Sequence, residues 1–240
     1  MIVLNYHRLC VGATTDAWSL TGPQFDAHTE VFRSRLIAPL VFLARSHEPA
    51  FARTNDVLLT FDDGCDSDYT YAFPRFAGTA GPGFVSFIVT DFVGRPGHLD
   101  WNMIQEMDRH GVVIGSHGVG HTDLTRLSRD DLNEEVRRSK AILEERLGHG
   151  VTPFAFPYGQ FSRRAWQAAL GAGYTHLFTI QLGYHNGFEP FLFSRLCMTN
   201  SMDVPYLRQH LENPCRNRGV AWRITNSLGL YRPAMLLRYR

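Results

Sequence analysis

Cysteine, net charge and long apolar runs are all scarce in this sequence, and each shortage excludes a class of protein. The four cysteines, Cys10, Cys65, Cys197 and Cys215, include no Cys-x-x-Cys pair, so they do not predict a thiolate zinc site. Their scattered spacing is typical of free thiols in a reducing compartment. A formal net charge of +1 gives no electrostatic reason to expect nucleic acid as a partner. No apolar run approaches the roughly 20 residues that a transmembrane helix needs.

The N-terminal residues 1–7 also lack the features of a secretory signal. They read Met-Ile-Val-Leu-Asn-Tyr-His, without a basic start, an apolar middle and a small-residue cleavage site. We therefore expect a cytoplasmic protein. At 240 residues and 44% apolar content, the chain can bury a substantial core.

Six short apolar runs rich in Val, Ile and Phe are spaced along the chain, and several are continuous rather than alternating. This pattern is typical of strands buried on both faces of a parallel sheet. Segments with helical patterns separate the runs, so we predict a single α/β domain, a distorted (β/α) barrel. The expected strands cover residues 2–4, 57–61, 84–89, 112–114, 151–156 and 175–180.

The clearest predicted helix follows Ser128. Ser128 and Asp131 have the spacing of a capping box. Apolar residues then recur at helical spacing, and Gly148 stands where a helix C-cap glycine belongs. The apolar positions are Leu132, Val136, Leu143 and Leu147.

Two adjacent aspartates, Asp62 and Asp63, end the strand predicted at residues 57–61 and precede a glycine. Adjacent carboxylates repel each other, and a cation relieves the repulsion. The C-terminal ends of barrel strands face the active site. A solvated Asp-Gly turn is the structural alternative. Cys65 follows directly, and we expect it to be a small residue in the pocket wall.

Two histidines four residues apart, His117 and His121, follow the strand predicted at residues 112–114. This spacing can present both imidazoles to one metal. The two glycines between them indicate a loop rather than a regular helix. Taken alone, a pair of surface or capping histidines would explain the motif equally simply.

The aspartates and histidines together make a more specific pattern. Two imidazoles and one carboxylate form a three-ligand set with a position left for water or substrate. Zn²⁺ suits such a set, and Co²⁺, Ni²⁺, Fe²⁺ or Mn²⁺ are alternatives. A divalent ion held there lowers the pKa of water and polarises an amide carbonyl. The second aspartate is then available as a base.

A third motif ends the strand predicted at residues 151–156. Pro157 and Tyr158 follow this strand, and the Tyr158 backbone N–H could donate to an oxyanion. An ordinary proline-containing turn is the alternative. We expect Pro157, Tyr158 and Trp101 to contact substrate. The flat rings of Tyr158 and Trp101 could stack on a sugar ring. Packing in the core is the alternative for Trp101.

These three motifs resemble the polysaccharide deacetylase family, also called NodB-type carbohydrate esterases, over roughly residues 1–200. The resemblance implies a distorted (β/α) barrel and metal-assisted removal of acetyl groups from an amino sugar. It implies that Asp62 is the catalytic base. It also implies that the metal is held by Asp63, His117 and His121.

Two departures from the family pattern matter. The third motif of the family opens with an arginine that orients the base, and this sequence has Ala155 there. We predict that Arg195 substitutes, with an ordinary core-edge arginine as the alternative. The family's late Leu-x-His, which carries the general acid, is also absent. In the branch that deacetylates poly-N-acetylglucosamine, the acid histidine lies in an N-terminal Tyr-His pair, so the resemblance implies that His7 is the acid. A histidine satisfied by a backbone group is the alternative.

The C-terminal 40 residues differ in composition from the rest of the chain. Residues 201–240 carry seven arginines, with Asp203 and Glu212 as the acids. This pattern suits contact with anionic lipid or a partner protein. We favour a basic extension that packs on or beside the barrel, with residues 1–200 as the deacetylase domain. The remaining histidines, at positions 28, 47, 98, 110, 149, 176, 185 and 210, are expected to be structural or exposed.

The sequence therefore predicts a carbohydrate N-deacetylase that acts on an N-acetylated saccharide, such as an oligo- or polysaccharide, a glycolipid or a biosynthetic precursor. An O-acetyl esterase or other amide hydrolase on the same fold is one alternative. A non-catalytic carbohydrate-binding domain or a membrane-associated domain is another. The four intact motif residues argue against a decayed site, whereas Ala155 argues mildly for one.

Overall fold

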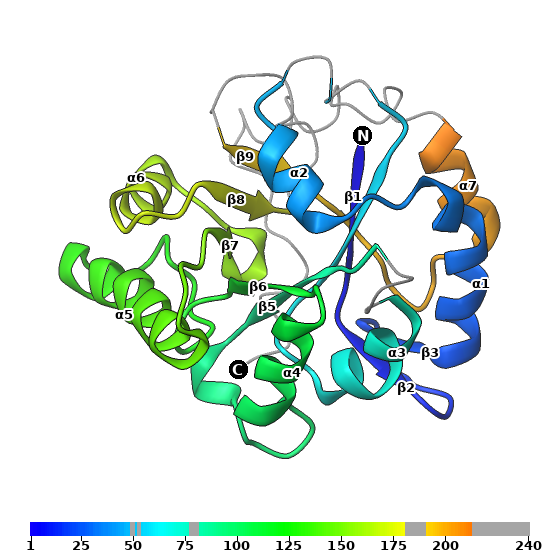
Figure 1. The fold of residues 1–240 in the computed structure, drawn as a ribbon, viewed down its shortest axis with the longest axis horizontal. Helices are drawn as coiled ribbons and strands as arrows, with labels where there is room; N and C mark the ends of the chain where they lie inside the picture. The colour runs from blue at the N-terminus through cyan, green and yellow to red at the C-terminus, as the bar shows by residue number, and fades with distance from the viewer. Residues whose placement is uncertain (49–50, 52–53, 77–81, 181–190, 213–240) are drawn as a thin grey trace.

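Eight parallel strands form one sheet that curves into a nearly closed barrel (Figure 1). The computed structural model describes residues 1–48, 51, 54–76, 82–180 and 191–212. The strand order is β10-β1-β4-β5-β6-β7-β8-β9. The strands are β1 (Ile2–Tyr6), β4 (Val57–Phe61), β5 (Val85–Ile88), β6 (Val113–Ser116), β7 (Pro153–Ala155), β8 (His176–Thr179), β9 (Leu192–Ser194) and β10 (Leu196–Cys197).

One short stretch of chain supplies both edge strands of this sheet. Strand β9 pairs with β8, and β10 pairs with β1. Only Arg195 separates β9 from β10, and its backbone N–H donates to the Thr179 carbonyl at 2.8 Å. The chain therefore passes from one edge of the sheet to the other at Arg195.

Each of the six predicted apolar runs overlaps one of these strands, which confirms the predicted barrel. Strand β4 has the predicted bounds, and all five of its residues are buried, as expected for a parallel sheet covered on both faces. Strands β9 and β10, and the two-stranded parallel sheet of β2 (Arg8–Cys10) and β3 (Ser19–Thr21), were not predicted. Segments of two or three residues are too short to show a period.

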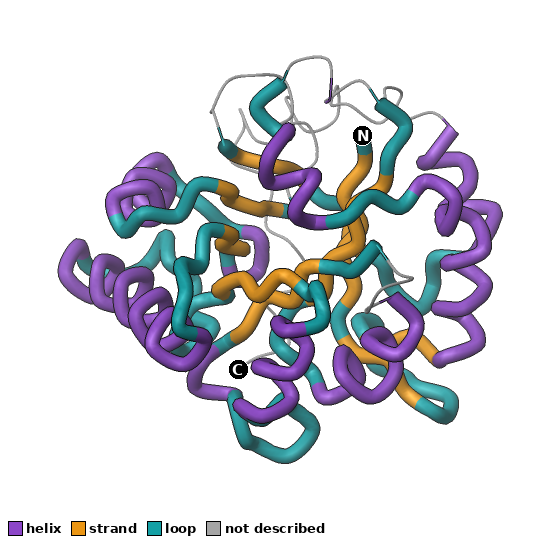
Figure 2. The backbone as a smooth tube through the Cα atoms, viewed as in Figure 1, coloured by secondary structure: helices purple, strands orange, loops and turns teal. Residues whose placement is uncertain are grey.

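Helices surround the barrel on its outside (Figure 2). None of those in the described part of the chain is long and apolar enough to cross a membrane. The α-helices are α1 (Gly22–Phe32), α2 (Pro39–Arg45), α3 (Phe73–Phe76), α4 (Trp101–Arg109), α5 (Arg129–Leu147), α6 (Arg163–Gly171) and α7 (Val204–Glu212). Shorter turns of 3-10 or π type are η1 (Arg33–Arg35), η3 (Asp68–Ala72), η4 (Thr90–Phe92) and η5 (Pro157–Gly159).

Helix α5 has the predicted caps at both ends. The Ser128 hydroxyl accepts the Asp131 backbone N–H at 3.2 Å and donates to the Asp131 carboxylate at 2.7 Å. Gly148 ends the helix in the left-handed conformation, with φ 78°. The apolar face of α5 is buried through Leu132, Val136 and Leu143, as its helical spacing predicts.

The described part of the basic C-terminal segment packs on the barrel's helices. Helix α7 contacts α1, and its Leu207 and Leu211 are buried. Most of the segment's arginines lie beyond residue 212 and outside the described residues. A division of the chain at residue 200 therefore stays a prediction.

Candidate metal centre and active site

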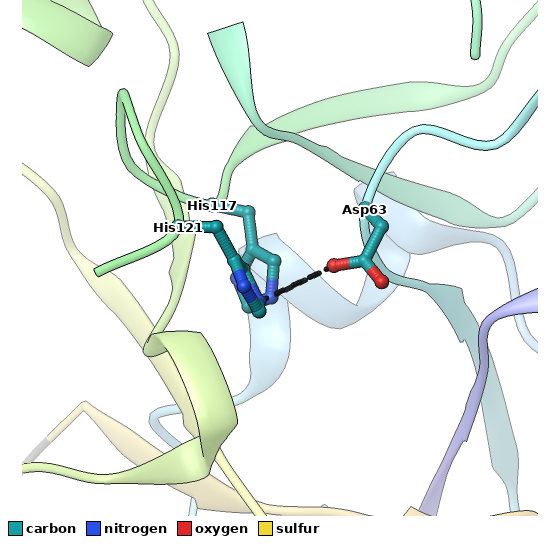
Figure 3. Close-up of side chains that lie close together, drawn as sticks. All are labelled: Asp63, His117 and His121. Carbon is teal, nitrogen blue, oxygen red and sulfur yellow. Dashed lines mark ion pairs between the residues drawn. The ribbon is translucent and has the colours of Figure 1, made fainter. Parts of the chain in front are cut away.

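Asp63, His117 and His121 come together where β4 and β6 end (Figure 3). The Asp63 Oδ1 atom lies 3.6 Å from His117 Nε2 and 3.4 Å from His121 Nε2. One ligand atom from each residue lies within 4.8 Å of the others. Asp63 and the two histidines, far apart in sequence, meet because parallel strands bring their C-terminal ends to one rim.

Hydrogen bonding and burial prepare both imidazoles to accept a cation. His117 Nδ1 lies 2.8 Å from the Ala155 carbonyl. Because a carbonyl can only accept, Nδ1 carries a proton, and Nε2, on the side of Asp63, is the ring nitrogen that could bind a metal. Burial, together with the neighbouring His117, lowers the pKa of His121 to about 4. His121 is therefore neutral at pH 7 and able to bind a metal.

Three residues of the site adopt the left-handed backbone conformation that L-residues rarely occupy. The φ angles are 74° at Asp63, 54° at His121 and 57° at Tyr158. Each costs roughly 1–2 kcal/mol relative to ordinary backbone. Such strain gathers at functional sites, where the surrounding fold holds it in place. The only other non-glycine residue of this kind in the described chain is Phe191.

An unpartnered carboxylate oxygen marks the place where a cation fits. Asp63 Oδ1 is buried and has no hydrogen-bond donor among the described residues. A buried carboxylate oxygen without a donor is costly unless a cation accompanies it. Two imidazoles and one carboxylate suit Zn²⁺ and other divalent transition metals. The three residues therefore fit the metal that the sequence predicts.

Asp62 lies beside the three candidate ligands and is held by Arg195. Arg195 Nη1 donates to Asp62 Oδ1 at 2.6 Å, and Nη2 donates to Oδ2 at 2.7 Å. Asn5 Nδ2 donates to Oδ2 at 3.0 Å. Asp62 and Arg195 are only 3% and 1% exposed. Burial raises the pKa of Asp62, but the charge and hydrogen bonds of Arg195 outweigh it and bring the pKa well below its ordinary value. Asp62 is therefore ionised at neutral pH.

Ala155 occupies the position where the family pattern has an arginine, and Arg195 reaches Asp62 from the junction of β9 and β10. Ala155 is fully buried in the barrel beside Phe178. The Arg195 guanidinium lies 5.2 Å from the Phe87 ring centre and 5.9 Å from that of Phe178. Aromatic faces attract cations at these distances. The fold thus supplies the missing arginine from the point where the barrel closes.

His7 follows β1 and lies at the same rim. Its ring centre is 5.2 Å from that of Trp18, and its Nδ1 is buried without a described hydrogen-bond partner. Burial lowers the pKa of His7, but Cys197 and the carboxylates of Asp63 and Asp62 outweigh it and raise the pKa to about 9. A protonated imidazole is what a general acid needs at neutral pH.

Of the three predicted substrate contacts, the structure brings only Tyr158 to the cavity. The Tyr158 ring centre is 4.4 Å from that of His121. Pro157 is buried and is not among the described residues that form the wall. Trp101 lies in the first turn of α4, where it packs on the core with Arg146 over its ring at 5.2 Å. Trp101 is not among the described residues that line the cavity, and its packing matches the core alternative.

The cavity has a volume of about 370 Å³, within the usual range for small-molecule sites. Several of its wall residues had no predicted role in the site, among them Asn5, Arg8, Asp16 and Trp18. Arg8 lies in β2 and Trp18 directly precedes β3. No sequence motif predicts where this segment lies in the fold. Asn5 precedes the Tyr-His pair in β1, so only its nearness to that pair could have singled it out.

The cysteines are as expected where the structure describes them. Cys10, Cys65 and Cys197 are free. Cys65 lines the cavity, and burial raises the pKa of its thiol, which makes it a poor nucleophile. Cys215 and His185 lie outside the described residues.

Comparison with known proteins gives a family-model match and curated relatives. The family model for polysaccharide deacetylases matches residues 52–177, slightly more than half of the chain. YxkH of Bacillus subtilis, named as a polysaccharide deacetylase, is 25% identical over 178 residues, which cover 72% of this chain and 61% of YxkH. The peptidoglycan-N-acetylglucosamine deacetylase of Bacillus cereus is 27% identical over 106 residues, which cover 44% of this chain and 37% of that enzyme. This chain spans less than two thirds of the length of both relatives.

A solved structure shows the same fold. The Streptococcus pyogenes deacetylase PplD, determined in complex with acetate, superposes with a TM-score of 0.72 at 22% identity. The match covers 88% of this chain and 97% of PplD. At this identity the likeness bears on the fold alone.

Proposed function

Because this chain belongs to the polysaccharide deacetylase family, we propose that it is a divalent-metal-dependent enzyme that removes N-acetyl groups from an amino sugar. One observation carries the proposal. The buried, unpartnered Asp63 Oδ1 faces the Nε2 atoms of His117 and His121, and an ionised Asp62 lies next to it. The name of the Bacillus cereus relative supports an N-acetylglucosamine unit as substrate.

Asp63, His117 and His121 would hold the metal, which when bound polarises the acetamide carbonyl and lowers the pKa of water. Zn²⁺ suits this donor set best. Each ligand is already oriented, because Ala155 fixes the His117 tautomer and the fold fixes the backbone of the other two. The site therefore requires little rearrangement on binding.

The residues around this centre divide the proton transfers between them. The Asp62 carboxylate accepts a proton from the water that attacks the acetyl carbon. Arg195 and Asn5 keep that carboxylate in place. The Tyr158 backbone N–H donates to the oxygen that becomes negative. His7 gives a proton to the leaving nitrogen, and acetate and a free amino sugar result.

Acetate release tests the proposal directly. The metal-loaded chain is incubated with paired N-acetylated and O-acetylated sugars, with and without a chelator. We expect acetate from the N-acetylated sugar, and we expect the chelator to abolish its release. Release from the O-acetylated sugar alone would indicate an esterase. Release that persists with the chelator would contradict the metal dependence.

Asp62→Asn and Asp203→Asn are the matched variants for this assay. Both remove one carboxylate charge with little change in volume, but Asp203 caps α7 by accepting the Tyr206 N–H, far along the chain from the site. We expect Asp62→Asn to lose acetate release by about a hundredfold or more. Asp203→Asn should retain it.

A further inference from the structure

Arg8 stands out among the residues that line the cavity, because it is a cation without a matching carboxylate. It follows His7 directly and lines the cavity wall. Its Nη2 donates to the Gly97 carbonyl at 3.1 Å, and no ion pair joins it to a carboxylate in the part of the chain that the structure describes. A half-buried guanidinium normally has an anionic partner.

The three carboxylates of the cavity wall are engaged elsewhere. Asp62 is paired with Arg195, and Asp63 faces the two histidines. The third, Asp16, accepts the Trp18 backbone N–H at 3.3 Å and the Ser19 hydroxyl at 2.7 Å. None of them neutralises Arg8.

The backbone around Arg8 holds its guanidinium against the cavity wall. Gly97 has φ 79°, and a Cβ there would lie 2.8 Å from Arg8 Nη1. A side chain at position 97 would therefore displace the guanidinium. The neighbouring His98 also lines the cavity, with its Nδ1 3.3 Å from the Pro96 carbonyl. The Arg8 guanidinium is therefore closely confined beside Gly97.

Trp18 forms an apolar face beside this cation. Its ring lies 5.2 Å from His7, and its loop is fixed by the Asn200 N–H, which donates to the Ala17 carbonyl at 2.9 Å. Since His7 must reach the leaving nitrogen, a sugar that carries that nitrogen lies next to Trp18. Aromatic rings commonly cover the apolar faces of such ligands.

We propose that Arg8 and Trp18 form a subsite for an anionic saccharide, with Trp18 against the sugar ring and Arg8 on a phosphate or carboxylate group of the substrate. The proposal rests on the proposed function, because His7 and the metal centre locate the sugar. It narrows the substrate class from N-acetylated sugars in general to those with an acidic substituent.

The test compares sugars that differ in charge. N-acetylglucosamine, its 1-phosphate and 6-phosphate, and N-acetylmuramic acid are assayed with the metal-loaded chain, and the phosphate and carboxylate arms distinguish the two sources of charge. We expect kcat/KM for at least one anionic sugar to exceed that for the neutral sugar by about 10- to 100-fold, mainly through KM.

Arg8→Gln and Arg95→Gln are the matched pair. Arg95 is exposed over the Phe92 ring and does not line the cavity. Arg8→Gln should bring the ratio of anionic to neutral kcat/KM close to one, Arg8→Lys should restore part of it, and Arg95→Gln should leave it as in the parent. Equal ratios in the parent and in Arg8→Gln would overturn the proposal.

A binding measurement separates this subsite from the catalytic proposal. Calorimetric titration of the Asp62→Asn variant with the same sugars needs no turnover. Binding of an anionic sugar that Arg8→Gln weakens about tenfold supports the subsite even if no sugar releases acetate. Acetate release with no preference for charge would support the deacetylase and overturn the subsite.

Discussion

Arg195, between β9 and β10, and Asp62, which follows β4, form a buried ion pair. The guanidinium donates to both carboxylate oxygens, a geometry that lysine cannot reproduce. A buried pair contributes little net stability, but the loss of one member leaves an uncompensated charge. The pair therefore orients the Asp62 carboxylate, and substitution of either residue should be poorly tolerated.

Substitution of Arg195 should destabilise the chain and impair the base together. We expect Arg195→Met to lower the free energy of unfolding by about 3–5 kcal/mol and to lower kcat, as measured by urea unfolding and acetate release. Arg208→Met is the control, because Arg208 is exposed on α7. If Arg195→Met unfolded at the same urea concentration as Arg208→Met, the ion pair would not be needed for stability.

His7 should leave a signature in the pH dependence of the reaction. Its protonated form is the proposed acid, so kcat/KM should fall at high pH as that proton is lost. We expect His7→Gln to lower kcat and to remove this high-pH limb, as measured by initial rates across the pH range. A His7→Gln profile with the parent's high-pH limb would assign the acid to another group.

At the scale of elements, the strand ends decide where the site forms, and glycines allow those ends to approach each other. Gly159 has φ 63°, and a Cβ there would lie 2.1 Å from Ile180 Cγ1 at the end of β8. Gly148 also has a positive φ, 78°, but a Cβ there would meet nothing within 4 Å. A substitution at Gly148 therefore tests backbone strain alone, whereas one at Gly159 tests backbone strain and a steric overlap together.

Alanine at these two positions should have unequal costs. We expect Gly148→Ala to destabilise the chain by about 1 kcal/mol through backbone strain. Gly159→Ala should cost roughly 1–3 kcal/mol more, because its Cβ overlaps Ile180. Thermal or urea unfolding of both variants measures the difference. Equal costs would mean that η5 can shift away from β8.

The sequence predicts the elements that have a repeating pattern and the residues that lie in a motif. All six apolar runs overlap a barrel strand, and α5 has its predicted caps. The contact between Asn5 and Asp62 could not be predicted, because it depends on the register of β1 with β4. For Trp101 the sequence left a sugar contact and core packing open, and in the structure its ring packs against the core.

At the scale of the whole molecule, a buried histidine links the barrel to its outer helices. His28 in α1 is 2% exposed. Its Nε2 lies 2.9 Å from the Met202 carbonyl, which can only accept, and its Nδ1 lies 3.3 Å from the Tyr6 hydroxyl. The neutral tautomer with a proton on Nε2 satisfies both contacts. Burial lowers the pKa of His28 from its ordinary value of 6.5.

Acid should therefore weaken the fold in a way that depends on His28. The unfolded chain binds this proton more tightly than the folded chain, so the free energy of unfolding falls as pH drops below about 6.5. We expect His28→Gln to reduce this fall, as measured by urea unfolding between pH 8 and pH 5. His110→Gln, at an exposed position on the end of α4, is the control. A fall as steep in His28→Gln as in the control would contradict the role of His28.

The proposed metal centre is most directly tested by metal content per chain. The parent and Asp62→Asn should each bind one divalent ion, measured by elemental analysis and calorimetric titration with Zn²⁺. His117→Ala should lose that ion, whereas His110→Ala, which removes an exposed imidazole, should keep it. One ion bound to His117→Ala with the parent's affinity would contradict the metal centre and with it the proposed function.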